Sequence, residues 1–267
     1  MILASHGIIA SSILQVDGDW LAYYNRVIAA GGSLTTTEQS ATLQLVLDLK
    51  TNSLWTPMKA IYPMVGASAA ACAQNLKSSS FTGTFTSGWT FASTGVTGNG
   101  TSAFFNTGLN TSTNLTLTST HLSIYVRNNT SGTSYDLANA TNGGMGVDPT
   151  YLISRYVGNA AYIGIADTLY ATTFSSIDSR GFWLGATNGS RAQNLYKNGT
   201  SVASGTGLGN FANNNLYLGA ANGGGSPVYF SDKQFALCSI GDGLNNTQQS
   251  NFYTAVQAFQ TTLSRQV

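Results

Sequence analysis

Charged side chains are scarce in this sequence. Only 8% of the 267 residues are Asp, Glu, Lys or Arg, and Glu38 is the only glutamate. Globular domains usually carry about a quarter charged residues. The 11 basic residues nearly balance the 10 acidic ones, which gives a net charge of +1. This balance argues against nucleic-acid binding, which needs a basic face to neutralise phosphates, and against polybasic attachment to a membrane.

Cysteine and long apolar runs are also scarce. Cys72 and Cys238 are far apart in the sequence, and we expect two buried free thiols, as suits assembly in a reducing cytoplasm. Whether the fold brings the two together stays open. The first ten residues lack a basic region, and residues 5–7 (Ser-His-Gly) interrupt their apolar run, so a signal peptide is not expected. No segment approaches the ~18 consecutive apolar residues that membrane insertion requires.

The first 57 residues predict an arm followed by a helical hairpin. Residues 1–16 form a short apolar arm, expected to find a partner surface and so to anchor or oligomerise the subunit. In residues 17–57, Asp17 or Asp19 can cap a first helix, and Thr35 with Glu38 has capping-box spacing for a second. The apolar arm residues are Ile2, Leu3, Ile8, Ile9, Ile13 and Leu14. The expected helix faces are Trp20, Tyr24, Val27 and Ile28 in the first helix and Leu43, Val46, Leu47 and Lys50 in the second.

From residue 58 onward the hydrophobic period changes to two. Leu122, Ile124 and Val126 alternate with polar positions, which is typical of a half-buried strand. Asn198-Gly199 lies between two short strand-like runs and predicts a type I′ hairpin turn. Similar runs recur along the chain, one of them at residues 84–91. Many short strands separated by turn residues predict an antiparallel sandwich over residues 58–267.

The last thirty residues predict a helix again. Asn245 can cap it with Gln248, and an apolar stripe follows. The stripe consists of Phe252, Val256, Phe259 and Leu263. We expect this helix to cover one side of the sandwich.

Several strings resemble known families. Gly181-Phe-Trp-Leu-Gly-Ala186, Leu195-Tyr-Lys-Asn-Gly199 and Leu216-Tyr-Leu-Gly-Ala220 resemble the later strands of concanavalin A-like (laminin G-like) jelly rolls. Residues 26–32, 59–66, 88–95 and 253–260 resemble virion-associated proteins of tailed bacteriophages and prophages. Together the matches cover most of residues 20–267. The resemblance implies a jelly-roll sandwich in a tail, fibre or head decoration, assembled in the bacterial cytoplasm with copies of itself and other virion proteins as partners.

The sequence offers no catalytic constellation. Retaining glycosidases of the same sandwich superfamily use two glutamates, whereas Glu38 stands alone at a helix cap. His6 and His121 are the only histidines, and no Gly-x-Ser-x-Gly motif is present, so neither serine hydrolysis nor a zinc site is expected. Laminin G-like domains often hold calcium at a loop rim, which makes Asp148 with Asn142 a conceivable pair. Ordinary turn residues are the preferred interpretation, and no cofactor is expected.

Sugar binding without catalysis stays open. It would use an aromatic ring for the apolar side of a pyranose and amide groups for its hydroxyls. Aromatic candidates and two Asn/Gly loops, at 142–144 and 222–225, suit this role. The candidate residues are Trp183, Tyr156, Tyr229, Asn142 and Asn222.

The sequence as a whole predicts a mainly β jelly-roll protein with an N-terminal helical hairpin and a C-terminal helix. Its expected function is that of a non-enzymatic virion structural protein that displays a lectin-like sandwich, with attachment to host-surface glycans as a further role. The alternatives are a dedicated carbohydrate-binding adhesin, a self-assembling lattice or filament subunit without ligand, and a glycanase that uses Asp residues.

Overall fold

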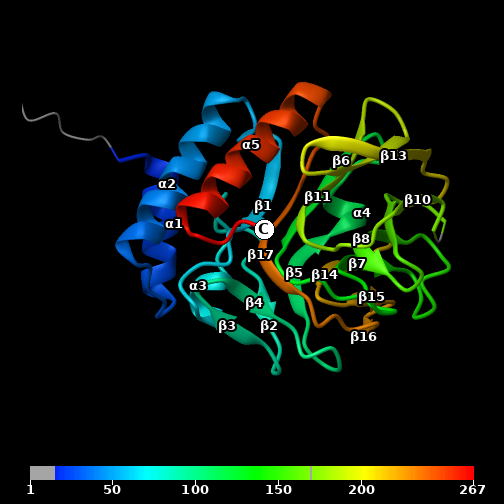
Figure 1. Cartoon of the computed structure of the whole chain (residues 1–267), viewed down its shortest axis with the longest axis horizontal. Helices are drawn as coiled ribbons and strands as arrows, with labels where there is room; N and C mark the ends of the chain where they lie inside the picture. The colour runs from blue at the N-terminus through cyan, green and yellow to red at the C-terminus, as the bar shows by residue number, and fades with distance from the viewer. Residues whose placement is uncertain (1–15, 169) are drawn as a thin grey trace, which may run out of the picture.

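The computed structural model describes residues 16–168 and 170–267, so the six apolar arm residues lie outside the described residues. Two β-sheets face each other, and three helices cover the outer face of one sheet (Figure 1). The protein is therefore a mainly β sandwich with a few helices, as the sequence predicts.

All strand pairs in sheet A are antiparallel, although neighbouring strands in the sheet are often far apart in the chain. Its strands lie in the order β13-β12-β11-β6-β17-β4-β3, and β1 also pairs with β17. The bounds are β1 (Met58–Tyr62), β3 (Thr90–Ala92), β4 (Gly95–Thr97), β6 (Ser119–Val126), β11 (Gly181–Asn188), β12 (Ala192–Lys197), β13 (Thr200–Thr206) and β17 (Gln234–Gly241). The hairpin at Asn198-Gly199 is confirmed, because Lys197 pairs with Thr200 and both turn residues have positive φ. The run at 84–91 is not one strand: the chain turns at Gly88, where φ is +92°.

Sheet B has the order β10-β9-β8-β7-β14-β5-β2, and β15 joins it beside β7 in the parallel sense. The bounds are β2 (Thr84–Phe85), β5 (Phe105–Asn110), β7 (Leu137–Ala140), β8 (Thr150–Tyr156), β9 (Ala160–Gly164), β10 (Thr172–Ser175), β14 (Asn215–Leu218), β15 (Ala221–Gly223) and β16 (Ser226–Val228). One-turn helices α3 (Ala69–Cys72) and α4 (Thr111–Asn114) lie in the connections.

Three longer helices begin where the capping residues predict. Asp17 caps α1 (Gly18–Ala29), Thr35 and Glu38 form a capping box on α2 (Thr36–Thr51), and Asn245 does the same with Gln248 on α5 (Asn246–Thr262). Lys50 joins the first two helices, since its Nζ lies 2.7 Å from Asp17 Oδ2. No described helix is long and apolar enough to span a membrane.

The buried faces of α1 and α2 agree with those expected only in part: Trp20, Val27 and Val46 are buried as expected. In α1, Tyr23 is fully buried while Ile28 is 46% exposed. In α2, Leu45 and Leu49 are buried while Leu47 is 39% exposed. Both helices carry apolar residues on more than one side, so spacing within the helix leaves the buried side ambiguous. Packing against α2 and α3 decides it for α1, and packing against α1 and α5 decides it for α2.

Strand β6 is buried on both faces rather than on one. Leu122, Ile124 and Val126 enter the core between the two sheets, and Tyr125 enters a second core beneath the helices. His121 is also fully buried. The alternation of the sequence is real, but the helices cover the face that was expected to be solvated.

Arg265, which follows α5, is hydrogen-bonded to sheet A. The fully buried Arg265 donates hydrogen bonds to the backbone carbonyls of Pro63, Met64 and Ala236, at 3.1, 2.8 and 3.0 Å. Its partners therefore come from the end of β1 and from β17. Cys72 and Cys238 are buried and free, as expected.

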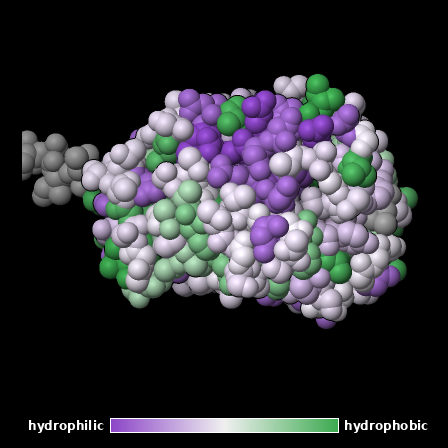
Figure 2. All heavy atoms as spheres, turned by 60° about the horizontal axis from the view of Figure 1, so that its bottom comes forward, coloured by the Kyte–Doolittle hydropathy of each residue, from purple (hydrophilic) through white to green (hydrophobic). Residues whose placement is uncertain are grey.

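The surface reflects the low charge of the sequence. Figure 2 shows hydrophilic residues gathered in one band of the visible face, with strongly hydrophobic residues as separate spots. Isolated apolar residues of this kind are normal on a soluble surface. A connected pale green area, which is mildly hydrophobic, lies beside that band.

Candidate functional site

Three loops converge at one end of the sandwich and border an open cavity of about 560 Å³. They follow β4, β6 and β16, and the last two lead into β7 and β17. The lining consists of Asn99, Gly100, residues 131–134, Tyr229, Phe230 and Asp232. Ligand pockets usually have volumes of about 300–1,000 Å³, so the cavity is large enough for a small molecule or one to two sugar rings.

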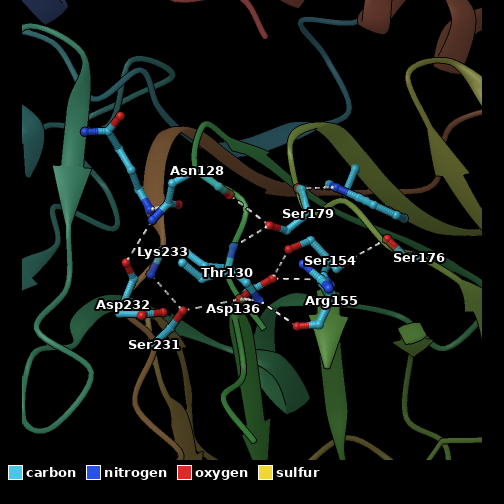
Figure 3. Close-up of polar contacts among 12 residues, drawn as sticks. Asn128, Thr130, Asp136, Ser154, Arg155, Ser176, Ser179, Ser231, Asp232 and Lys233 are labelled. Carbon is cyan, nitrogen blue, oxygen red and sulfur yellow. Dashed lines mark hydrogen bonds and ion pairs between the residues drawn. The ribbon is translucent and has the colours of Figure 1, made fainter. Parts of the chain in front are cut away.

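A buried ion pair lies beside the cavity. Lys233 Nζ is 2.8 Å from Asp136 Oδ1, and neither side chain is exposed (Figure 3). Lys233 also donates to the backbone carbonyl of Arg155 at 3.0 Å, and Asp136 Oδ2 accepts from the amide and hydroxyl of Ser154 at 2.7 and 2.6 Å. A buried charge without such partners would be strongly destabilising. The pair therefore fixes the start of β7 relative to the start of β17.

Hydrogen bonds to Ser179 fix the neighbouring loop. The hydroxyl of Ser179 donates to the carbonyl of Asn128 at 2.8 Å and accepts from the amide of Thr130 at 3.2 Å. Trp183 Nε1 donates to the carbonyl of Ser179 at 2.8 Å. Figure 3 shows Asn128, Thr130 and Ser179 near the ion pair. The loop that supplies residues 131–134 to the cavity is thus held at its base.

Tyr229 forms one wall of the cavity in a strained backbone conformation. Its φ is +57°, in the left-handed region that residues other than glycine seldom adopt. The residue is 38% exposed, and its ring packs on Tyr135 with the ring centroids 5.3 Å apart. The Tyr135 amide donates to the Tyr229 carbonyl at 3.0 Å, which helps to hold this conformation. Such strain persists where the surroundings enforce it and is found disproportionately at ligand sites.

Behind Tyr229, a cluster of tyrosines covers the outer face of sheet B. We call it the tyrosine cluster, and its rings lie 4.6 to 6.3 Å from their neighbours. Its members are Tyr135, Tyr151, Tyr156, Tyr162, Tyr170 and Tyr229. Burial raises the pKa of Tyr135, Tyr151, Tyr156 and Tyr170. These hydroxyls therefore stay protonated at neutral pH.

Two of the five expected sugar-binding residues meet in this region. Tyr156 and Tyr229 both pack on Tyr135, with centroid distances of 6.2 and 5.3 Å. Trp183 does not join them and is a correction to the expectation. It is fully buried between the sheets, where Lys197 Nζ lies 4.7 Å from its ring centre. Sequence alternation alone could not show that both faces of β11 are covered.

The two Asn/Gly loops lie side by side but away from the cavity. A side chain at Gly223 would approach the Cα of Gly143 to 2.5 Å, so the loops are in contact. They lie at the end of β7 opposite Tyr135. Asn142 is exposed, whereas Asn222 is only 2% exposed and donates to the Asn215 carbonyl at 2.9 Å. The Asn222 side-chain amide is thus used in hydrogen bonds within the protein and not for a ligand.

Both members of the conceivable calcium pair already accept backbone hydrogen bonds. Asp148 Oδ1 accepts from the amide of Asn210 at 2.9 Å, and Asn142 Oδ1 accepts from the amide of Gly146 at 3.2 Å. Within residues 16–168 and 170–267, no three His, Cys, Asp or Glu side chains are grouped as metal ligands. The donor set here does not resemble the six or more oxygens that calcium takes.

Most of the cavity residues were not singled out from the sequence. Asn99, Asp232 and the run Ser131-Gly-Thr-Ser134 resemble ordinary loop residues, and three loops far apart in the chain supply them. A signal was available in the tyrosines: six of the 13 in the chain gather in one cluster.

Comparison with known proteins gives no family. No family model matches the chain, and no curated protein sequence matches it. Several solved structures are similar to parts of it. Domain 4 of AbnA, a GH43 extracellular arabinanase from Geobacillus stearothermophilus, in complex with arabinotriose, is 14% identical, with 73% of this chain and 98% of that domain covered and a TM-score of 0.45.

Two sialidase structures are also similar to part of the chain. The CBM40 of Ruminococcus gnavus IT-sialidase is 14% identical over 48% of this chain and 79% of that one, with a TM-score of 0.36. The NanB sialidase from Streptococcus pneumoniae is 12% identical over 51% of this chain, with a TM-score of 0.36. The match spans only 24% of the NanB chain.

Proposed function

We propose that this protein binds carbohydrate, without hydrolysing it, in the cavity between the three loops. The observation that carries the proposal is the exposed ring of Tyr229, held in a left-handed backbone conformation at the wall of a polar cavity of about 560 Å³. A pyranose presents an apolar face to an aromatic ring and hydroxyls to polar side chains. The hydroxyls of Ser131, Thr133 and Ser134 and backbone groups supply the polar side, whereas the Asn99 side chain is bonded within its own loop.

The charges of the cavity argue against hydrolysis. Among the described lining residues, Asp232 is the only one with a carboxyl side chain, whereas most glycosidases use a pair of carboxyl groups. The neighbouring acid, Asp136, is fully buried and paired with Lys233. It therefore has no access to a substrate in the cavity.

A binding experiment on Tyr229 tests the proposal. A glycan array identifies ligands for the full chain, and titration calorimetry then compares the protein with its Tyr229→Ala variant. Loss of the stacked ring should weaken binding about tenfold, which corresponds to an aromatic contact of about 1.4 kcal/mol. Tyr24→Ala is the matched control, because Tyr24 is a half-buried tyrosine on α1. No glycan binding on a high-avidity array, or an unchanged affinity of Tyr229→Ala, would overturn the proposal.

We also propose that the sandwich has jelly-roll topology and that the protein acts as a displayed virion component. The sequence resemblance to phage virion-associated proteins supports this context, and the virion location stays a prediction. In that setting the cavity would face host-surface glycans, while the arm at residues 1–16 would join copies of the chain or other virion proteins. Imaging of native particles with an antibody against this chain tests the location, and an unlabelled particle would contradict it.

A further inference from the structure

The cavity carries one charged side chain, and that charge is negative. Asp232 follows Tyr229 by three residues and is exposed in the cavity wall. Within residues 16–168 and 170–267, no hydrogen bond or ion pair engages its carboxylate, and only its backbone carbonyl accepts, from Asn128 Nδ2 at 3.1 Å. The carboxylate is therefore free to meet a ligand.

The two cations nearest to the cavity are already engaged. The ammonium of Lys233 is fully buried, 2.8 Å from Asp136. The guanidinium of Arg155 donates to Asn159 Oδ1 at 2.7 Å and to Asn129 Oδ1 at 2.8 Å. Neither residue lines the cavity. Among the described residues that line the cavity none is basic, so an anionic ligand would meet the Asp232 carboxylate with no cation in the same lining.

From this arrangement we propose that the cavity selects sugars that carry a free, protonated amino group over neutral sugars, and neutral sugars over carboxylated or sulfated ones. This inference rests on the proposed carbohydrate binding at the same site. An ammonium group gains from the Asp232 carboxylate by ion pairing and from the face of the Tyr229 ring by cation–π attraction. N-acetylation removes the positive charge and with it both gains.

Four tetrasaccharides with β-1,4 linkages separate these classes by calorimetry on the full chain. They are the tetramers of glucosamine, N-acetylglucosamine, glucose and glucuronic acid, measured below the pKa of the sugar amine. We expect the glucosamine tetramer to bind about fivefold to tenfold more tightly than the two neutral tetramers. The glucuronic acid tetramer should bind most weakly. Added salt should weaken the glucosamine tetramer far more than the neutral ones.

The variant Asp232→Asn tests the residue itself. The affinity ratio of the glucosamine to the N-acetylglucosamine tetramer should fall to about one, because the amide keeps the shape and removes the charge. Asp48→Asn on α2 makes the same change in net charge away from the cavity and should leave the ratio as it is.

The outcomes separate the two proposals. Absence of binding by all four tetramers and by the glycan array would remove the proposed function. Binding in which the acidic or neutral tetramers equal the glucosamine tetramer would overturn the charge selectivity and leave carbohydrate binding in place. A ratio that survives Asp232→Asn would equally contradict the role of Asp232.

Discussion

At the residue scale, His121 shows how the fold uses a titratable group away from the cavity. It is fully buried in β6. Its Nδ1 lies 2.6 Å from the carbonyl oxygen of Asp242 and so must carry the proton, which leaves Nε2 to accept from the Ser239 hydroxyl at 3.2 Å. Ser239 in turn lies 2.6 Å from the Ser123 hydroxyl. The neutral ring thus joins β6 to β17 and to the segment beyond it.

Burial lowers the pKa of His121 from 6.5 to about 4, which predicts a specific pH dependence of stability. Below pH 6.5 His121 is protonated in the unfolded chain but stays neutral in the folded chain. The contribution of neutral His121 to folding stability is therefore complete above pH 6.5 and is lost as the pH falls through 4. The free energy of unfolding should fall by about 3 kcal/mol between pH 7 and pH 4 from this residue alone. Urea unfolding at a series of pH values measures it.

The control is His121→Gln, which keeps polar groups but cannot be protonated. Other groups, such as Asp17 and Asp178, whose pKa values are lowered, contribute to acid unfolding in both proteins. The difference between the two pH profiles therefore isolates His121. Profiles that run parallel from pH 7 to pH 4 would contradict the prediction.

At the scale of elements, capping residues allowed the ends of helices to be predicted more reliably than their buried sides. Asp17, Thr35 and Asn245 act locally, through hydrogen bonds to amides two or three residues ahead, so the sequence alone identifies them. The buried side of α2 depends on what packs against it. Leu47 has the right spacing for a core position but faces solvent, because α1 and α5 contact the side that carries Leu45 and Leu49.

Helix α5 should be essential for the stability of sheet A. Phe252 is fully buried, and its ring packs edge-on against Phe182 of β11, with the centroids 5.3 Å apart. Phe252→Ala removes this contact and leaves a void, so we expect a loss of about 3–5 kcal/mol in the free energy of unfolding. Denaturant unfolding followed by circular dichroism measures it.

Ile28→Ala is the matched control, since Ile28 lies on a helix but is 46% exposed. It should cost less than about 1 kcal/mol. Equal losses in the two variants would show that α5 does not cover sheet A in the way described.

At the scale of the molecule, the sandwich could be predicted and the cavity could not. Alternation, the Asn198-Gly199 turn and the terminal helix are patterns within about 20 residues, and each fixes local structure. The cavity joins Asn99, Ser131 and Asp232, which come together only when both sheets are complete. Tyr229 was among the residues expected to bind sugar, but its left-handed conformation depends on its contacts with Tyr135 from another loop.

The ion pair between Lys233 and Asp136 connects the two sheets and predicts an asymmetry among variants. Asp136→Asn leaves a buried ammonium without its counter-ion, so the free energy of unfolding should fall by about 3–5 kcal/mol. The double variant Asp136→Leu with Lys233→Met removes both charges and should recover at least half of that loss. Chemical denaturation of both variants and of the parent measures the coupling.

The donors of Ser154 lose their acceptor in the double variant, so full recovery is not expected. The single variants Asp136→Leu and Lys233→Met complete the thermodynamic cycle. A double variant as unstable as the sum of the single ones would show that the two side chains act independently.

The hydrogen bonds from Arg265 to the carbonyls of Pro63, Met64 and Ala236 can form only late in synthesis of the chain. Strand β1 leaves the ribosome early, yet its partner in the sheet is β17, about 175 residues later in the chain. Sheet A cannot close around β17 until residues 234–241 have emerged, and the guanidinium contacts form later still. The first strand therefore stays unpaired until β17 has emerged, and during that time its edge is exposed to pairing with other chains.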